Sequence, residues 1–290
     1  MTILDEIKLR FQQNNAITRI IFLNVFVFLF FSILSVLGFL FNQSFFSGII
    51  DYFVLPSNLS KLMFQPWSIL SYMFLHDGFM HILFNMLWLY WVGSLLQEYL
   101  GNTKTYEAYF LGGISGGILY LLAYNFLPAF AANVSYSFAL GASAGVLAVV
   151  CAAATLLPDY NFKLLFFGNV KLKYIALISV LLDLISIPQG NAGGHIAHLG
   201  GALFGYLFIK LIYANNNFSH KLDAFFDSIL NFFNSKPKIK IQHKTTFMKT
   251  AINARPSQVD VDVILDKISK SGYESLSQAE KETLFKASKD

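Results

Sequence analysis

The sequence predicts an all-α, polytopic membrane protein: a bundle of six transmembrane helices with an interfacial first loop and a small cytoplasmic helical tail. Apolar residues make up 55% of the 290 residues and charged residues only 13%, against about 25% charged residues in ordinary soluble domains. More than half of the charged residues fall in the last quarter of the chain. Long apolar runs, rather than a globular core, therefore account for the first three quarters.

Six apolar runs approach the roughly 20 residues that cross about 30 Å of hydrocarbon. The expected spans are Ile20 to Phe41, Phe79 to Leu96, Ala108 to Phe126, Phe138 to Leu157, Tyr174 to Ile187, and Ile196 to Tyr213. No small-residue cleavage site follows the first run, so we expect a retained span rather than a signal peptide.

The basic residues indicate how these spans are oriented. Those before the first span, in the loops after the second and fourth, and at the end of the sixth are Lys8, Arg10, Arg19, Lys104, Lys163, Lys171, Lys173 and Lys210. The alternate loops contain only Lys61. Both termini are therefore predicted to be cytoplasmic. Because the cations flank apolar runs, lipid headgroups are the expected partner and nucleic acid is not.

The composition divides the chain into three parts. Residues 1–214 form the predicted membrane domain, and its long, apolar first outer loop, Asn42 to Gly78, is expected to lie in the membrane interface. Residues 215–258 combine an amphipathic helix, Phe218 to Phe233, with a basic linker around Pro237 and Lys240. Residues 259–290 have the polarity of a small cytoplasmic helical module.

Two predicted helices make up this last module. An apolar stripe on the first consists of Val261, Ile264, Leu265 and Ile268. Gly272 is expected to end that helix, and Ser277 with Glu280 forms a capping box for a second helix. Fewer than 40 residues provide little core, so the module is expected to dock on something to be stable.

Polar residues gather near the outer ends of the second, fourth and sixth spans. They are His76, His81 and Asn85, then Gly141-Ala142-Ser143-Ala144-Gly145, and then His195 and His198, with Gly200, Gly201 and Gly205 following. Polar groups at membrane depth are costly and usually face the bundle interior with a partner. Three clusters at one depth therefore predict a common site.

The residue types predict nucleophilic chemistry at this site. A serine hydroxyl needs a base to remove its proton, and a neutral histidine is the usual base, so Ser143 and His198 are the natural pair. Ser143 begins a helix, where backbone N–H groups favour developing negative charge. His81 and Asn85 are four residues apart, on one helical face, and both can donate to an oxyanion.

Small residues predict how the helices bearing this pair approach each other. Ala197, Gly201 and Gly205 recur every four residues on the sixth span, and Gly141 and Gly145 on the fourth offer matching space. The glycines of the third span, Gly112, Gly113, Gly116 and Gly117, are expected to mark close helix packing as well.

Together these motifs resemble the rhomboid intramembrane protease family. The residues that carry the resemblance are His76-x4-His81-x3-Asn85, Gly141-Ala142-Ser143, Ala197-His198-Leu199-Gly200-Gly201, Trp67, Glu98 and Gly101. The resemblance covers residues 17–214, with three motifs in order on the expected spans. Family members usually have glycine where Ala144 stands. The last module resembles, more weakly, a tail attached to rhomboids in some bacteria.

The resemblance implies a role for each motif residue. Ser143 would be the nucleophile and His198 the general base, without a metal or cofactor. His81, Asn85 and the Ser143 backbone N–H would line the oxyanion hole, while His76 would help to structure its loop. The implied function is peptide-bond hydrolysis in transmembrane protein substrates. The implied location is a bacterial inner membrane, with both termini in the cytoplasm. Neither residues nor resemblance predict an oligomeric state.

Simpler interpretations compete with this one. Ser143 could be a helix-packing serine, and Gly141 to Gly145 also fits the Gly-x-Ser-x-Gly elbow of soluble hydrolases, although no preceding strand is predicted. His195 could be a second partner or an alternative base. The histidines show no chelating spacing for zinc.

Two residues and two other functions complete the alternatives. Cys151 is expected to be a packing residue. Asp183 could relay protons in a transporter, cap or hydrogen-bond within the bundle, or orient His198. The rival functions are a non-catalytic rhomboid-like binder, which would need neither Ser143 nor His198, and a small transporter, which would need a polar path through the whole bilayer.

Overall fold

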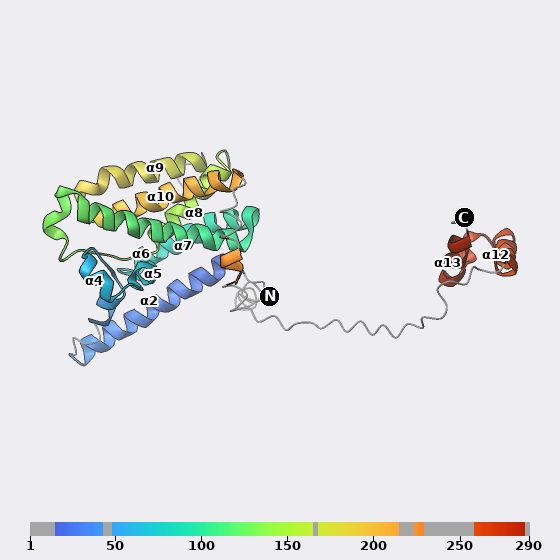
Figure 1. The fold of residues 1–290 in the computed structure, drawn as a ribbon, viewed down its shortest axis with the longest axis horizontal. Helices are drawn as coiled ribbons and strands as arrows, with labels where there is room; N and C mark the ends of the chain where they lie inside the picture. The colour runs from blue at the N-terminus through green and yellow to red at the C-terminus, as the bar shows by residue number, and fades with distance from the viewer. Residues whose placement is uncertain are drawn as a thin grey trace. The chain divides into compact units, whose positions relative to one another are not determined.

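The structure, a computed structural model, describes residues 15–42, 48–164, 168–214, 222, 224–228 and 258–287. The chain forms two compact units, residues 1–235 and 236–290, which we describe separately. The described residues are mostly helical, and Figure 1 shows α7, α8, α9 and α10 of the first unit running alongside one another.

The first unit contains both long and short elements. They are α2 (Ala16–Leu40), η1 (Ile49–Tyr52), β1 (Leu55–Pro56), α4 (Leu59–Phe64), α5 (Ser68–Ser71), η2 (Tyr72–Phe74), α6 (Phe79–Trp88), η3 (Leu89–Gly93), α7 (Ser94–Phe126), η4 (Pro128–Asn133), β2 (Phe138–Ala139), α8 (Ser143–Leu156), β3 (Asn161–Leu164), β4 (Gly168–Lys171), α9 (Leu172–Ser186), η5 (Ile187–Gln189) and α10 (Ala192–Tyr213).

Four helical runs in the described residues are long and apolar enough to cross a membrane. They are Ala16–Leu40, Phe79–Phe126, Leu172–Gln189 and Ala192–Tyr213, and Ser143–Leu156 is a shorter apolar helix. The 48-residue run Phe79–Phe126 contains Gly101 with non-helical φ 79° and ψ 178°. The predicted second and third spans are the parts of this run on either side of that break.

The prediction for the fourth span was wrong at its start. Helix α8 begins at Ser143, five residues after the expected Phe138. Phe138 and Ala139 instead form β2, which pairs antiparallel with Pro56 and Leu55 of β1. An apolar run alone does not distinguish a short buried strand from a helix.

Glycines bring α7, α8 and α10 together at backbone distance. A Cβ at Gly201 would lie 2.1 Å from the carbonyl oxygen of Ala144, and one at Gly205 would lie 2.1 Å from that of Ala148. On α7, a Cβ at Gly116 would lie 2.5 Å from the carbonyl oxygen of Ala197. The close packing expected of these glycines is confirmed, and no side chain would fit without moving backbone.

Helix α2 is held mainly at its start. Asn15 caps it by accepting from the Thr18 N–H. The Ala16 and Ile17 backbone N–H groups donate to Asn102 Oδ1 and Gln97 Oε1, each at 3.0 Å. In Figure 1, α4 and α5 lie between the far part of α2 and the α7–α10 group.

The first loop exposes many apolar side chains, as an interfacial segment would. Those with about half or more of their surface exposed are Tyr52, Met63, Phe64 and Trp67. Phe45 and Phe46, which also led to that prediction, lie outside the described residues. So do most of the predicted amphipathic helix Phe218–Phe233 and the basic linker. Residues 224–228 are helical, with Phe226 buried and Asp227 accepting a 2.7 Å hydrogen bond from Thr103.

The second unit contains α12 (Gln258–Ser271), η6 (Tyr273–Ser275) and α13 (Gln278–Ala287). The predicted capping box is confirmed, because Ser277 N–H donates to Glu280 Oε2 at 2.7 Å and Glu280 N–H donates to Ser277 Oγ at 3.4 Å. Gly272 ends α12 with φ 79°, as predicted. Within the predicted stripe, Ile264 is buried and Leu265 is 49% exposed.

Candidate active site

Ser143 stands at the first residue of α8, just after a segment that the rest of the chain fixes in place. The Gly141 N–H donates to the Tyr72 carbonyl at 2.9 Å, and Gly141 has φ +129°. A Cβ at Gly141 would lie 3.0 Å from the His81 ring and 3.3 Å from Ser143 Oγ. Glycine is therefore required here for its conformation and for the approach of His81 to the serine.

The serine hydroxyl lies within a hydrogen bond of the predicted base. Ser143 Oγ and His198 Nε2 are 2.6 Å apart, although the residues are 55 positions apart in the chain. The approach depends on Gly201, one turn after His198 on α10, because its missing side chain lets α10 contact the Ala144 backbone.

The other nitrogen of the His198 ring faces a carboxylate. His198 Nδ1 lies 2.8 Å from Asp183 Oδ1, and His195 Nδ1 lies 2.8 Å from the same oxygen. The Asp183 side chain is 13% exposed and each histidine side chain 23%. His195 therefore does not replace His198 beside Ser143 in this geometry, but shares its carboxylate.

The two candidate oxyanion donors lie on one turn of α6. The Asp77 backbone N–H donates to His81 Nδ1 at 3.3 Å, which leaves the His81 proton on Nε2, the nitrogen nearest Gly141. Asn85 Nδ2 donates one proton to the His81 carbonyl at 2.9 Å. An amide nitrogen carries two protons, so a second remains to donate.

His76 lies behind this pair in the loop before α6. Its ring is 8% exposed and contacts the His81 ring edge-on, with 5.1 Å between centroids. Burial, and secondly the proximity of His81, lowers the pKa of His76 to about 4. The ring is therefore neutral at physiological pH and packs as an uncharged support.

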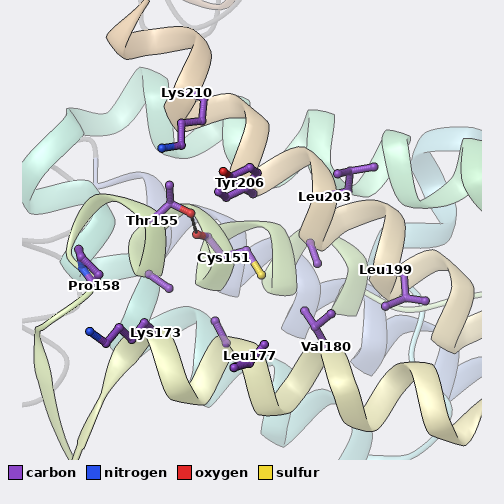
Figure 2. Close-up of a pocket in the computed structure, with 13 residues that line it drawn as sticks. Cys151, Thr155, Pro158, Lys173, Leu177, Val180, Leu199, Leu203, Tyr206 and Lys210 are labelled. Carbon is purple, nitrogen blue, oxygen red and sulfur yellow. Dashed lines mark hydrogen bonds between the residues drawn. The ribbon is translucent and has the colours of Figure 1, made fainter.

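Two cavities contain candidate catalytic or oxyanion-hole residues, and a third lies beside them. One, of about 140 Å³, is lined by Ser143, Asp183 and His198 and also by Trp88 of α6. A second, of about 320 Å³, follows the α6 face that bears His81, Asn85 and Trp88. The largest, about 540 Å³, lies between α8, α9 and α10 toward Lys173 and Lys210, and includes none of the candidate catalytic residues (Figure 2).

Gly141 and Gly145 were expected to make room for the sixth span, α10, but they contact other parts of the chain. Gly145 does not face α10, since its added Cβ would meet the Tyr109 backbone of α7 at 2.7 Å, and Gly141 faces His81. The α8 positions that meet Gly201 and Gly205 are Ala144 and Ala148. Ala144, where glycine is usual in the family, fits beside the serine because Gly116 and Gly201 leave room for its methyl group.

A metal ion would find ligands in the same cluster. The ligand atoms of Asp183, His195 and His198 all lie within 4.8 Å of one another, and two imidazoles with one carboxylate is a known set of catalytic zinc ligands. Sequence spacing had argued against chelation because it did not include Asp183. A metal on His198 Nδ1 would displace the hydrogen bond to Asp183, so the two arrangements exclude each other.

Sequence reasoning underestimated Asp183 and missed Trp88. An acidic residue inside an otherwise apolar span was the available signal for Asp183, because such groups usually have a functional partner. Trp88 carried no signal, since an aromatic residue in an apolar span is ordinary.

Comparison with known proteins fits this arrangement. The Rhomboid domain family matches residues 63–215, and a family of unknown function, DUF6576, matches residues 251–290. RHOMBOID-like protein 12, mitochondrial, of Arabidopsis thaliana is 28% identical over 144 residues, covering 47% of this chain and 43% of that protein.

Two further relatives agree. Rhomboid-like protein 14, mitochondrial, of the same plant is 28% identical over 172 residues, covering 54% of this chain and 49% of its own length. Rhomboid protease GlpG of Klebsiella pneumoniae subsp. pneumoniae is 29% identical over 84 residues, covering 23% and 30%. The chain thus spans less than half the length of each of these relatives.

The matched domain covers just over half of the chain, and its fold is that of an integral membrane helical bundle. This chain belongs to the rhomboid family.

Proposed function

We propose that this chain is an intramembrane serine endopeptidase in which Ser143 is the nucleophile and His198 the general base. The observation that carries the proposal is the 2.6 Å contact between Ser143 Oγ and His198 Nε2, at the start of a helix and inside a small cavity. A packing serine would have no need of a base on a neighbouring helix.

The proposed reaction is acyl transfer to the enzyme and then to water. His198 Nε2 accepts the Ser143 proton as Oγ attacks the substrate carbonyl, and returns it to the leaving amine. The Ser143 backbone N–H, His81 Nε2–H and the second Asn85 amide proton stabilise the oxyanion. Water then hydrolyses the acyl-enzyme by the same proton transfers in reverse order. This chemistry uses no metal or cofactor.

The bundle proposed around this site crosses the membrane six times. The break at Gly101 divides the long run Phe79–Phe126 into two crossings, and α8 crosses as a short buried helix. Both termini are proposed to be cytoplasmic, in a bacterial inner membrane, with transmembrane proteins as substrates. The basic residues near alternate span ends support this orientation.

Covalent labelling tests the proposal. A fluorophosphonate probe should label the wild-type protein in mild detergent and should not label Ser143→Ala or His198→Ala. Both variants should also fail to cleave a single-span substrate, because losing a nucleophile or its base costs several orders of magnitude in rate. Ser186→Ala, which removes another serine hydroxyl, is the matched control and should label normally. Cleavage by Ser143→Ala at the wild-type rate would leave a non-catalytic binder as the better interpretation.

The oxyanion donors need a separate test. His81→Ala and Asn85→Ala should each lower kcat by about 10²–10³-fold, the usual loss for one donor. KM should change little, because the donors act on charge that develops during the reaction. Variants that raise KM at unchanged kcat would assign His81 and Asn85 to substrate binding instead.

A further inference from the structure

The contacts of Asp183 carry an inference that rests on the proposed function and goes beyond a serine–histidine pair. Asp183 lies on α9, opposite the side of the His198 ring that faces Ser143. An ionised carboxylate is an acceptor only, so a nitrogen 2.8 Å from it carries a proton and donates. His198 therefore has its proton on Nδ1, and its Nε2 is free to accept from the serine.

His195 does not displace His198 from this carboxylate. Each carboxylate oxygen has two lone pairs, so Asp183 Oδ1 can accept from both Nδ1 atoms at 2.8 Å. The two rings are nearly perpendicular, at 88°, with 6.0 Å between centroids. This arrangement leaves His195 as a second donor that helps to fix the carboxylate.

We propose that Asp183 is a positioning residue that holds His198 in the tautomer and orientation required of the general base. The site is then a Ser143–His198–Asp183 triad assembled from α8, α10 and α9. A carboxylate on Nδ1 also stabilises the imidazolium that forms when the serine proton moves. Asp183 thereby contributes to catalysis through His198.

The first test compares rates. Asp183→Asn should slow both fluorophosphonate labelling of Ser143 and substrate turnover by about 10²–10⁴-fold, with the loss in kcat rather than KM. Asp183→Glu should recover part of the loss, and Ser186→Ala, three residues along the same helix, should behave as wild type. A normal rate in Asp183→Asn would overturn the proposal. A rate loss in His195→Gln as large as that in Asp183→Asn would overturn it too. Asp183 would then act on the rate through His195 and not through His198.

The second test does not depend on activity. ¹⁵N spectra of histidine-labelled protein, assigned with His198→Gln and recorded with a chelator present, report which ring nitrogen carries the proton. Wild-type His198 should be protonated at Nδ1, and Asp183→Asn should lose this preference. A wild-type ring protonated at Nε2 overturns the positioning role. If the Nδ1 tautomer is present but no probe labels Ser143, the protease proposal fails and the inference about Asp183 stands.

A different observation, the apolar cavity between α8, α9 and α10, carries a second inference. This cavity, of about 540 Å³, lies between α8, α9 and α10, and we call it the α8–α10 groove. Figure 2 shows the side chains that line it. Most of its lining is apolar, including Cys151, Leu177, Val180, Leu199 and Leu203. Its polar end carries Lys173, Lys210 and Thr155, where α8 ends, α9 begins and α10 ends.

The polar end has an excess of positive charge. Lys171 and Lys173 both contact Asp159 Oδ1, at 2.9 and 2.8 Å, and Lys210 lies 5.5 Å from the Tyr206 ring centroid. The hydrogen bonds from Lys173 and then Lys171 lower the pKa of Asp159 to about 2, so it is ionised. Three lysines against one aspartate leave two positive charges beside an apolar groove.

We infer that the α8–α10 groove binds one acyl chain of an anionic phospholipid, with its phosphate between Lys173 and Lys210. From Lys173 to Val180 is seven residues and from Leu199 to Lys210 eleven, so the groove extends about 10–16 Å into the hydrocarbon. Cations at this level attract anionic headgroups. The inner end of the bound chain contacts Leu199, next to His198, and Val180, one turn before Asp183.

Lipid retention tests the inference. Protein reconstituted in equal amounts of phosphatidylglycerol and phosphatidylcholine, then examined by native mass spectrometry, should retain phosphatidylglycerol. Retention should fall about 5-fold for each of Lys173→Gln and Lys210→Gln, as roughly 1 kcal/mol per surface cation implies. Lys61→Gln removes an equal charge elsewhere and should have no effect. Leu177→Trp, which fills the groove, should displace the lipid from an otherwise unchanged protein. Equal retention in these three groove variants and wild type, or a preference for phosphatidylcholine, would overturn the inference.

Discussion

Helices α2 and α10 have similar lengths, 25 and 22 residues, but the protein holds them in different ways. In the most apolar stretch of each, 11% of α2 residues are buried against 44% of α10 residues. Helix α2 is fixed through side-chain caps at its start, and its contact at Gly93 is with the end of the Ile17 side chain. Helix α10 instead contacts the backbone of α8 and α7 through glycines.

This difference indicates where the protein tolerates change. A flexible side-chain end can move aside by a rotamer change, whereas a helix carbonyl can move only with its helix. The candidate catalytic residues Ser143 and His198 both lie on helices packed through such backbone contacts, α8 and α10. We expect substitutions there to affect rate first, and those near α2 to affect stability first.

The largest effect is expected for Gly201→Leu. Its Cβ would meet the Ala144 carbonyl at 2.1 Å, so α10 must move away from α8 and take His198 from Ser143. A displacement of about 1 Å can cost roughly 100-fold in rate. Turnover of a model substrate should fall at least that far, while Leu207→Ala on the exposed face of α10 should remain near wild type. Wild-type turnover in Gly201→Leu would show that this face does not set the geometry of the site.

An effect of pH is expected on the α2 side, where His76 lines a cavity with Val27, Phe28 and Phe31. The pKa of His76 is about 4 in the folded protein and 6.5 when free. Between these values the unfolded chain binds the proton and the folded protein does not, so stability falls as pH falls from 6.5 to 4. The full difference is roughly 3 kcal/mol.

Thermal unfolding in detergent measures this effect. Wild-type Tm should drop between pH 7 and pH 5 by more than the Tm of His76→Gln, which has no group to titrate at that position. Parallel curves for the two proteins would mean that His76 does not contribute to the acid sensitivity.

Two glycine-to-alanine changes compare the helices directly. Gly205→Ala places a Cβ 2.1 Å from the Ala148 carbonyl and should cost about 1–3 kcal/mol, as overpacking usually does. Gly93→Ala meets the end of the Ile17 side chain at 2.5 Å, which can turn away, so it should cost less. Denaturation midpoints of the two variants give the comparison. Equal losses would contradict the distinction between side-chain and backbone contacts.

The smallest effect on labelling of the active site is expected from removing the tail, residues 241–290. A chain ending at Lys240 lacks α12 and α13 and should still be labelled by a fluorophosphonate probe in detergent, because the candidate catalytic residues all belong to the first unit. Loss of labelling in a bundle that still resists proteolysis would assign the tail to the active machinery.

The sequence predicted the long helices well because each is a long apolar run, and the 3.6-residue period placed His81 with Asn85 on one face. It placed the start of α8 wrongly, because Phe138 and Ala139 pair with residues more than 80 positions earlier in the chain. Strand pairing over such a sequence distance cannot be predicted from the local pattern of apolar residues. For the same reason, Gly141 and Gly145 were given the wrong neighbours.

For the candidate site as well, local motifs were predictable from the sequence and tertiary packing was not. Ser143 and His198 could be paired from their motifs, and they lie 2.6 Å apart. Asp183 could be recognised as unusual but not assigned to His198, since no spacing rule states how α9 is rotated against α10. Side-chain chemistry was readable from the sequence, whereas the mutual rotation of helices was not.

The short length of α8 bears on how water reaches the chemistry. Fourteen residues make a helix of about 21 Å, while the hydrocarbon layer is about 30 Å thick. If the last turn of α8 reaches one face of that layer, its first residue ends about 9 Å below the other. The loop before α6 and the start of α10 bring polar side chains, His76 and His195 among them, to the end of α8 that bears Ser143, and polar groups at membrane depth favour water over hydrocarbon. In the proposed reaction, water would then reach the acyl-enzyme from this one side, because the rest of α8 is buried among apolar side chains.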